Sequence, residues 1–99
     1  MQTTLDELRV FIAVVDSGSI TRAAERLAMT NSATSRTLAR LEHKLDTTLI
    51  RRTTRRLELT EEGQDFLDRA RQILAAMQEA QEMLTLRHHS PAALTRPSP

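Results

Sequence analysis

The spacing of hydrophobic and polar positions predicts two short helices at the start of the chain. The apolar residues of the first helix recur three or four positions apart: Leu5, Leu8, Ile12 and Val15, with Phe11 and Val14 widening the stripe. This pattern predicts a helix over 6–17, and Gly18 follows it as a residue favoured just past a helix end. Ser19 and Thr21 are both good N-caps for a second helix that runs to about residue 28.

A third helix is predicted over 32–45, after a break of only three residues at 29–31. One face of this helix is apolar apart from one threonine: Thr34, Leu38, Leu41 and Leu45. The opposite face is polar: Ser32, Ser35, Arg36, Arg40 and His43. A short helix, a tight turn and a longer helix with a polar outer face are typical of a helix-turn-helix. From periodicity alone, an ordinary helical hairpin with a solvated polar face is an equally good interpretation.

The period changes to that of β-strands after residue 48. Residues 49–52 and 56–59 are short stretches of β-type character, and 53–55 would form the tip between them. Four arginines stand within six residues: Arg51, Arg52, Arg55 and Arg56. The pattern predicts a β-hairpin wing, and the alternative is a solvated, charged loop. Because no acid lies among these arginines, they repel one another, and a phosphate backbone would relieve the repulsion.

A long helix is predicted over 61–87, with Thr60 as its N-cap. Gly63 is expected only to weaken its first turn slightly. Its apolar positions alternate in steps of four and three, as in a coiled-coil seam: Phe66, Ala70, Ile73, Met77, Ala80 and Leu84. We expect this seam to meet the same seam of a second chain, and the alternative is that the helix folds back onto the first helix.

Composition and charge narrow the class of protein. The aromatic content is 2% and cysteine is absent, so the core must be aliphatic and neither a disulfide scaffold nor a thiolate metal site is possible. Residues 19–60 carry nine basic groups against four acidic ones, a balance of +5, whereas 1–18 and 61–99 each carry −2. The middle of the chain therefore has the charge of a polyanion binder. No signal peptide or membrane-spanning run is recognisable, so a cytoplasmic protein is expected.

Several separated motifs resemble one known family. Residues 18–27, 31–36, 41–45, 52–57 and 59–63 closely resemble the N-terminal domain of LysR-type transcriptional regulators, in a match that runs without a gap from residue 5 to about 86. The resemblance implies a mainly α fold: a winged helix-turn-helix with a two-stranded wing, followed by a long dimerisation helix. The sequence departs from the common pattern at Ser32, where proline is frequent, and at Thr34, where valine is. The Thr34 hydroxyl could bond to a carbonyl one turn earlier.

The resemblance also implies a function and partners. Such a chain would bind double-stranded promoter DNA as a homodimer, and full-length members mostly act as tetramers. The expected division is 1–60 for DNA binding, 61–87 for the linker helix and 88–99 for a flexible tail or a truncated linker. A small-molecule effector would bind only through a C-terminal domain that this sequence lacks.

Other classes of function are less well supported by the sequence. No cofactor, metal or enzymatic activity is expected, because the chain has no glycine-rich phosphate loop, no cysteine and no HExxH motif. The rival interpretation is a partner that forms heterodimers with full-length relatives. The chain could equally be the first part of a longer protein.

The family pattern assigns roles to individual residues. We expect Asn31, Ser32, Ser35 and Arg36 to enter the major groove, where Asn can bond to adenine and Arg to guanine. Arg40 should contact phosphate, and His43 only solvent. The wing should reach phosphates beside the minor groove, with Arg52 favoured over Arg51. The remaining DNA-binding candidates are Thr53, Arg55, Arg56 and Thr21, with Ser19 as the alternative to Thr21.

Overall fold

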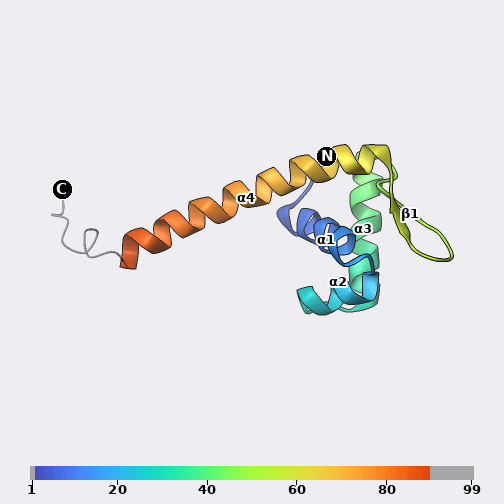
Figure 1. Ribbon diagram of the computed structural model, residues 1–99, viewed down its shortest axis with the longest axis horizontal. Coiled ribbons are helices and arrows are strands. Elements are labelled where there is room, and N and C mark those ends of the chain that lie inside the picture. The colour runs from blue at the N-terminus through green and yellow to red at the C-terminus, as the bar shows by residue number, and fades with distance from the viewer. Residues whose placement is uncertain (1, 90–99) are drawn as a thin grey trace.

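Four helices and a two-stranded sheet make up residues 2–89, the part of the chain that the computed structural model describes (Figure 1). In chain order they are α1 (Leu5–Ser17), α2 (Ile20–Leu27), α3 (Asn31–Leu45), β1 (Ile50–Arg52), β2 (Leu57–Leu59) and α4 (Glu61–His89). The predicted mainly α fold, with a small β wing and a long last helix, is confirmed. Each element begins and ends within two residues of its expected bounds. The expected tail lies, from residue 90 onward, outside the described residues.

The first three helices begin at hydroxyl side chains that bind the free amides of the first turn. Thr4 starts α1 with a capping box: its Oγ1 accepts from the Glu7 amide (3.2 Å) and the Glu7 carboxylate accepts from the Thr4 amide (2.8 Å). Ser19, rather than Thr21, caps α2, and its Oγ accepts from Arg22. Thr30 caps α3 in the same way (3.0 Å to the Ala33 amide), so α3 begins at Asn31.

The core lies where α1 meets the other helices. Its most deeply buried side chains are Phe11, Val14, Leu38, Leu41 and Leu49, each at most 1% exposed. The buried face of α1 differs from the predicted apolar stripe, because three residues of that stripe, Leu5, Ile12 and Val15, are only half-buried. The reason is that α2, α3 and α4 all pack on α1, so its buried arc is wider than one stripe. Thr34 is fully buried in this core, and its hydroxyl donates to the Thr30 carbonyl (2.9 Å), as expected.

Helix α4 divides into a packed part and a projecting part. Its first three turns lie on α1, where the rings of Phe66 and Phe11 are 5.6 Å apart and Leu67 and Ala70 are buried. Arg71 extends this contact with a bidentate ion pair to Asp16 at the end of α1 (2.6 Å and 3.3 Å). Beyond this point α4 leaves the rest of the fold and projects as a single rod (Figure 1). The fold-back alternative therefore holds for the first part of the helix only.

Strands β1 and β2 form an antiparallel hairpin beside α3 and before α4 (Figure 1). Ile50 pairs with Leu59, Arg51 with Glu58, and Arg52 with Leu57. Because side chains alternate along a strand, Ile50 and Arg52 share one face while Arg51 points to the other. Ile50 is buried, so the face that carries Arg52 is the face turned toward the helices.

Candidate nucleic-acid interface

The polar face of α3 lines a shallow hollow that is shared with α2 and β1. Six of the ten residues predicted to bind DNA line it, together with one apolar residue: Thr21, Asn31, Ser32, Ser35, Arg36 and Arg52, with Ile20. These positions come from three elements that are separated along the chain. The fold therefore gathers most of the predicted site on one surface.

Asn31 and Thr21 are joined across the turn between α2 and α3. The Asn31 side-chain amide (Nδ2) donates to Thr21 Oγ1 at 3.2 Å. Because this bond uses one amide hydrogen, the Asn31 carbonyl oxygen and the second amide hydrogen stay available to a ligand. Thr21 thus lies in the site as a neighbour of Asn31, whereas Ser19 is the residue that caps α2.

Ser35 and Arg52 join the third helix to the wing. The Arg52 guanidinium (Nη2) donates to Ser35 Oγ at 2.9 Å. Arg51, the next residue along the strand, lies on the opposite face of the hairpin, across from Glu58. Of the two arginines, Arg52 is therefore the one placed beside the polar face of α3.

The remaining α3 candidates differ in position. Arg36 is exposed and lines the hollow. Arg40 is exposed one turn further on, but it lines a different hollow with Thr37, Arg9 and Met29, between α3 and the start of α1. His43 is exposed as expected. Arg40 therefore lies one turn beyond Arg36 along the helix, beside a second hollow.

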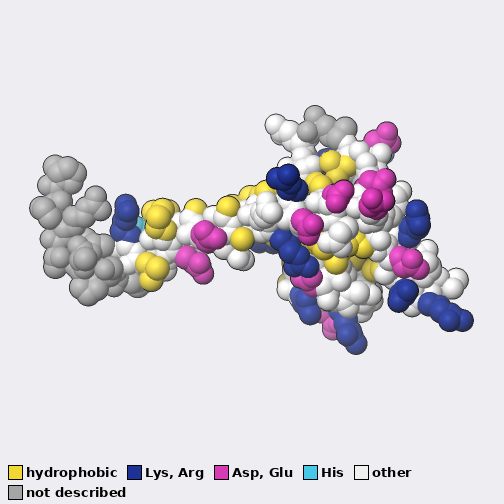
Figure 2. Space-filling view, turned by 45° about the horizontal axis from the view of Figure 1, so that its top comes forward, with side chains coloured by type: hydrophobic (Ala, Val, Ile, Leu, Met, Phe, Trp, Pro, Cys, Tyr) yellow, Lys and Arg dark blue, Asp and Glu magenta, His cyan; other side chains and the backbone are white. Residues whose placement is uncertain are grey.

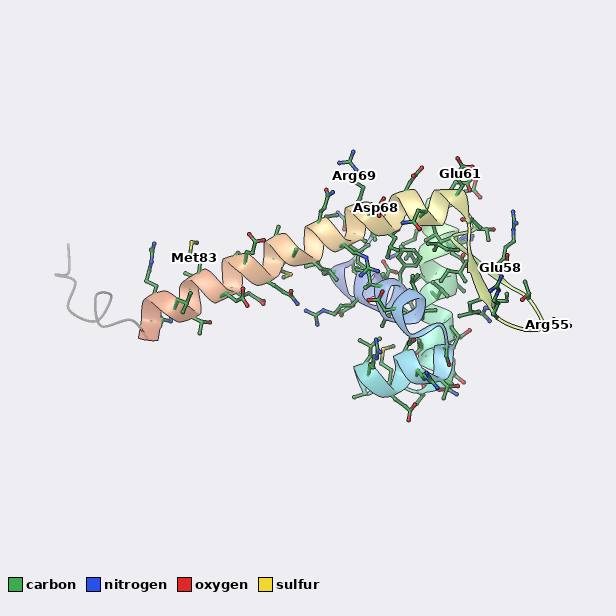
Figure 3. The ribbon with its side chains drawn as sticks, in the orientation of Figure 1. Arg55, Glu58, Glu61, Asp68, Arg69 and Met83 are labelled. Carbon is green, nitrogen blue, oxygen red and sulfur yellow. The ribbon has the colours of Figure 1, made fainter. Side chains whose placement is uncertain are left out.

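The tip of the wing is built around Thr53. Its hydroxyl accepts from the Arg56 amide (3.1 Å) and donates to the Arg56 carbonyl (2.7 Å), while its own amide donates to the same carbonyl (2.9 Å). These bonds close the turn that carries Arg55, which lies at the far end of the wing (Figure 3). Thr53 therefore shapes the tip, and the two arginines after it supply the charge.

Arg36 and the wing arginines belong to no ion pair within residues 2–89. The ion pairs within residues 2–89 are Lys44–Glu7 and Arg71–Asp16, and neither involves α3's Arg36 or a wing arginine. On the face drawn in Figure 2, Lys and Arg side chains lie at the wing end and also along the lower edge of the compact part of the molecule, with Asp and Glu side chains among them. Free guanidinium groups on an exposed wing and helix are suited to phosphate and base edges.

Two residues that hold the interface in place were missed by sequence reasoning. Glu42 stands in the family motif at 41–45, and its Oε2 accepts from the amides of Leu49 and Ile50 (2.7 Å and 3.0 Å) and so anchors the wing to α3. Gly63 does more than loosen a helix turn, because a Cβ there would lie 2.2 Å from the Leu49 carbonyl oxygen. Neither role has a signal in the helical pattern, since each partner lies outside the helix that carries the residue.

The fold and its basic hollow define the class of a winged helix-turn-helix protein that binds DNA. The pattern described as "Bacterial regulatory helix-turn-helix protein, lysR family" matches residues 5–64. The chain therefore belongs to the LysR family of bacterial transcriptional regulators. Within residues 2–89, no helix has the length and apolar character needed to cross a membrane.

Similar proteins include regulators and DNA complexes. The chain is 52% identical over 91 residues to the HTH-type transcriptional regulator CrgA of Neisseria meningitidis serogroup B, a match that covers 92% of this chain and 30% of that protein. A solved structure of CrgA from Neisseria meningitidis, also 52% identical, superposes with a TM-score of 0.76 over 88% of this chain and 30% of that one. The BenM DNA-binding domain in complex with benA site 1 DNA is 31% identical, with a TM-score of 0.81 over 89% of this chain and 99% of that one. The chain thus spans about a third of the length of CrgA.

Proposed function

We propose that this chain binds double-stranded promoter DNA in a sequence-specific manner, as a homodimer, and thereby regulates transcription. Helix α3 enters the major groove, and the wing over 51–56 lies along the backbone beside the adjacent minor groove. Because its ligand is chromosomal DNA, the protein works in the cytoplasm, and binding rather than catalysis is its activity.

The observation that carries this proposal is the hollow itself. Asn31, Ser32, Ser35 and Arg36 present amide, hydroxyl and guanidinium groups from the N-terminal half of α3, the part of a recognition helix that reaches base edges. The opposite face of the same helix is buried in the core through Thr34, so α3 is held rigidly with its polar face outward. The similarity to a LysR-type domain solved with DNA supports the same mode of binding.

The wing and two outlying residues are assigned to the sugar–phosphate backbone. Arg55 and Arg56 extend from the hairpin without acidic partners and would contact phosphates or a narrow minor groove. Arg40 would contact phosphate one turn beyond Arg36, where its separate hollow lies. Thr21 would support Asn31 and lie beside the backbone near the start of α2.

The projecting part of α4 is proposed as the dimer seam. Ile73 and Leu84 are 48% and 53% exposed, and Met77 and Ala80 lie between them along the helix. Phe66 and Ala70, the first two predicted seam residues, are already used by the core of one chain: Ala70 is 1% exposed and Phe66 contacts Phe11. We therefore assign dimerisation mainly to the four later residues. The chain divides accordingly into a DNA-binding part over 1–60 and a linker helix over 61–87.

The test is selection of bound duplexes from a random library, followed by affinity measurements with the unaltered chain and with Arg36→Ala. We expect a selected site with two related half-sites, and a loss of about 1 to 3 kcal/mol in discrimination at one base pair for the variant. Arg69→Ala, which removes an exposed arginine of α4 far from Arg55 at the tip of the wing (Figure 3), should leave the selected site unchanged. Recovery of no preferred sequence by the unaltered chain would refute sequence-specific binding.

A further inference from the structure

The hydrogen bond between the wing and the recognition helix has a direction that matters for DNA. Arg52 donates and Ser35 accepts, over 2.9 Å, and a guanidinium cannot accept in return. Serine hydroxyls in helices often donate to the carbonyl one turn earlier, as the hydroxyls of Thr34 and Thr37 do here. The hydrogen bonds found within residues 2–89 include none that Ser35 donates. Its proton is therefore left for a ligand in the hollow.

The positive charge beside Ser35 reinforces this polarity. A guanidinium within hydrogen-bond distance polarises the hydroxyl and makes it a stronger donor. The same charge repels an approaching amino group, such as N4 of cytosine, and favours an acceptor, such as O6 or N7 of guanine or O4 of thymine. Adenine also presents an acceptor, N7, but beside its N6 amino group, whereas cytosine presents only an amino group. Without Arg52, a free hydroxyl could rotate and either donate or accept.

We propose that Arg52 is a specificity-determining residue that acts through Ser35: it holds the Ser35 hydroxyl as a donor, so that the base facing it is guanine or thymine and cytosine is rejected. This rests on the mode of DNA binding proposed above. Arg52 is thus a positioning residue for base recognition, in addition to any charge that it brings to the backbone.

The experiment compares four proteins on duplexes that differ only at the base pair whose preference disappears in Ser35→Ala. The proteins are the unaltered 99-residue chain, Arg52→Met, Ser35→Ala and the double variant. In the unaltered chain we expect guanine or thymine at that position. Arg52→Met should reduce the discrimination of that base against cytosine by about three- to tenfold. In the Ser35→Ala background, the same change should leave discrimination unaltered. Discrimination is a ratio of two affinities of one sample, so partial unfolding of a variant cancels.

The matched control is Arg51→Met, which removes the same charge from the opposite face of the same strand. It should lower the affinity for all duplexes by one common factor. The proposal is overturned if Arg52→Met behaves as Arg51→Met does, or if cytosine is the selected base. It is also overturned if Arg52→Met reduces the discrimination between bases as much in the Ser35→Ala variant as in the unaltered chain. That result would mean that Arg52 contacts the base itself. Absence of any selected sequence would instead refute the proposed function, and this assignment with it.

Discussion

At the scale of single residues, the buried Glu7 shows how a charge is kept inside this small core. Its side chain is 2% exposed, and Lys44 lies 2.8 Å from its Oε2. Burial alone would raise the pKa of Glu7, but the hydrogen bonds from Lys44 and from the Thr4 amide and the charge of Lys44 together lower it below its ordinary value. Lys44 also donates to the Gln2 carbonyl, so the group links the N-terminus of the chain to α3.

The lowered pKa of Glu7 predicts a specific pH dependence of stability. A carboxylate whose folded pKa is depressed stabilises the fold above its unfolded pKa of about 4.3, and this stabilisation is lost as the pH falls through the folded value. We expect Glu7→Gln to lower the free energy of unfolding at pH 7 and to flatten its fall between about pH 5 and pH 3. Urea denaturation over that range measures it, with Asp6→Asn at the exposed neighbour as control. A Glu7→Gln profile as steep as that of the unaltered chain would contradict the assignment.

Gly63 gives a second prediction at the residue scale, because replacing it by alanine should change the stability in the opposite direction from the usual one. Alanine in place of a helical glycine ordinarily stabilises a protein by up to about 1 kcal/mol. Here the new Cβ would lie 2.2 Å from the Leu49 carbonyl oxygen and 2.8 Å from Leu59 Cδ1, so α4 and the wing would have to move apart. We expect Gly63→Ala to destabilise the fold by about 1 to 3 kcal/mol in urea denaturation. Gly18→Asn, where there is open space and φ is +69°, should cost less, and a stabilised Gly63→Ala would refute the close approach.

At the scale of elements, the wing is rigid at its base and charged at its tip. Glu42 binds the amides at the start of β1, and Thr53 closes the turn at the other end. Between these two anchors the strand alternation separates Arg51 from Arg52. The wing is therefore an arm of defined shape that presents Arg55 at its end (Figure 3).

For Arg55 we expect a loss of affinity that does not depend on sequence. Arg55→Ala should weaken binding to all duplexes alike and reduce the slope of log affinity against log salt by about 0.9, the contribution of one phosphate. Titrations of selected and unrelated duplexes at several salt concentrations measure this. The matched α4 variant Arg69→Ala should keep the slope. A change of base preference in Arg55→Ala, with an unchanged slope, would place the residue on a base instead.

At the scale of the whole molecule, the division of α4 leaves a large apolar surface without cover in one chain. Hydrophobic side chains continue along α4 beyond the rest of the fold (Figure 2), and Met83 lies near its far end (Figure 3). Exposed apolar surface on a regular helical seam is typical of an interaction surface between chains. Two chains joined here would present two copies of α3, as a pair of half-sites requires.

The prediction at this scale is that Ile73→Asp yields monomers in sedimentation velocity, because a buried carboxylate in the seam would have no partner. The part of the fold before Ile73 should stay folded, since Ile73 lies beyond the last fully buried residue of α4, Ala70. Gln72→Asp adds the same charge at an exposed polar neighbour and should leave the dimer intact. An unaltered dimer in Ile73→Asp would rule out this seam.

The elements of the fold and the class of the protein could be predicted because their determinants are local. A hydroxyl such as Ser19 or Thr60 caps a helix by binding an amide only three residues away, and periodicity reports which face of that helix is apolar. The excess of arginines in the middle of the chain is likewise visible without a fold. Together with the motifs of the family, these signals were enough to predict a winged helix-turn-helix that binds DNA.

Tertiary structure decided what depends on contacts between different elements of the fold. Only the fold brings Arg52 to Ser35, Glu42 to the start of β1 and Gly63 against the Leu49 carbonyl. It also divides the regular apolar series of α4 between the core of one chain and an exposed seam, because α1 covers only the first three turns of the helix. Spacing records that a face is apolar, whereas what covers that face is set by the packing of the other helices.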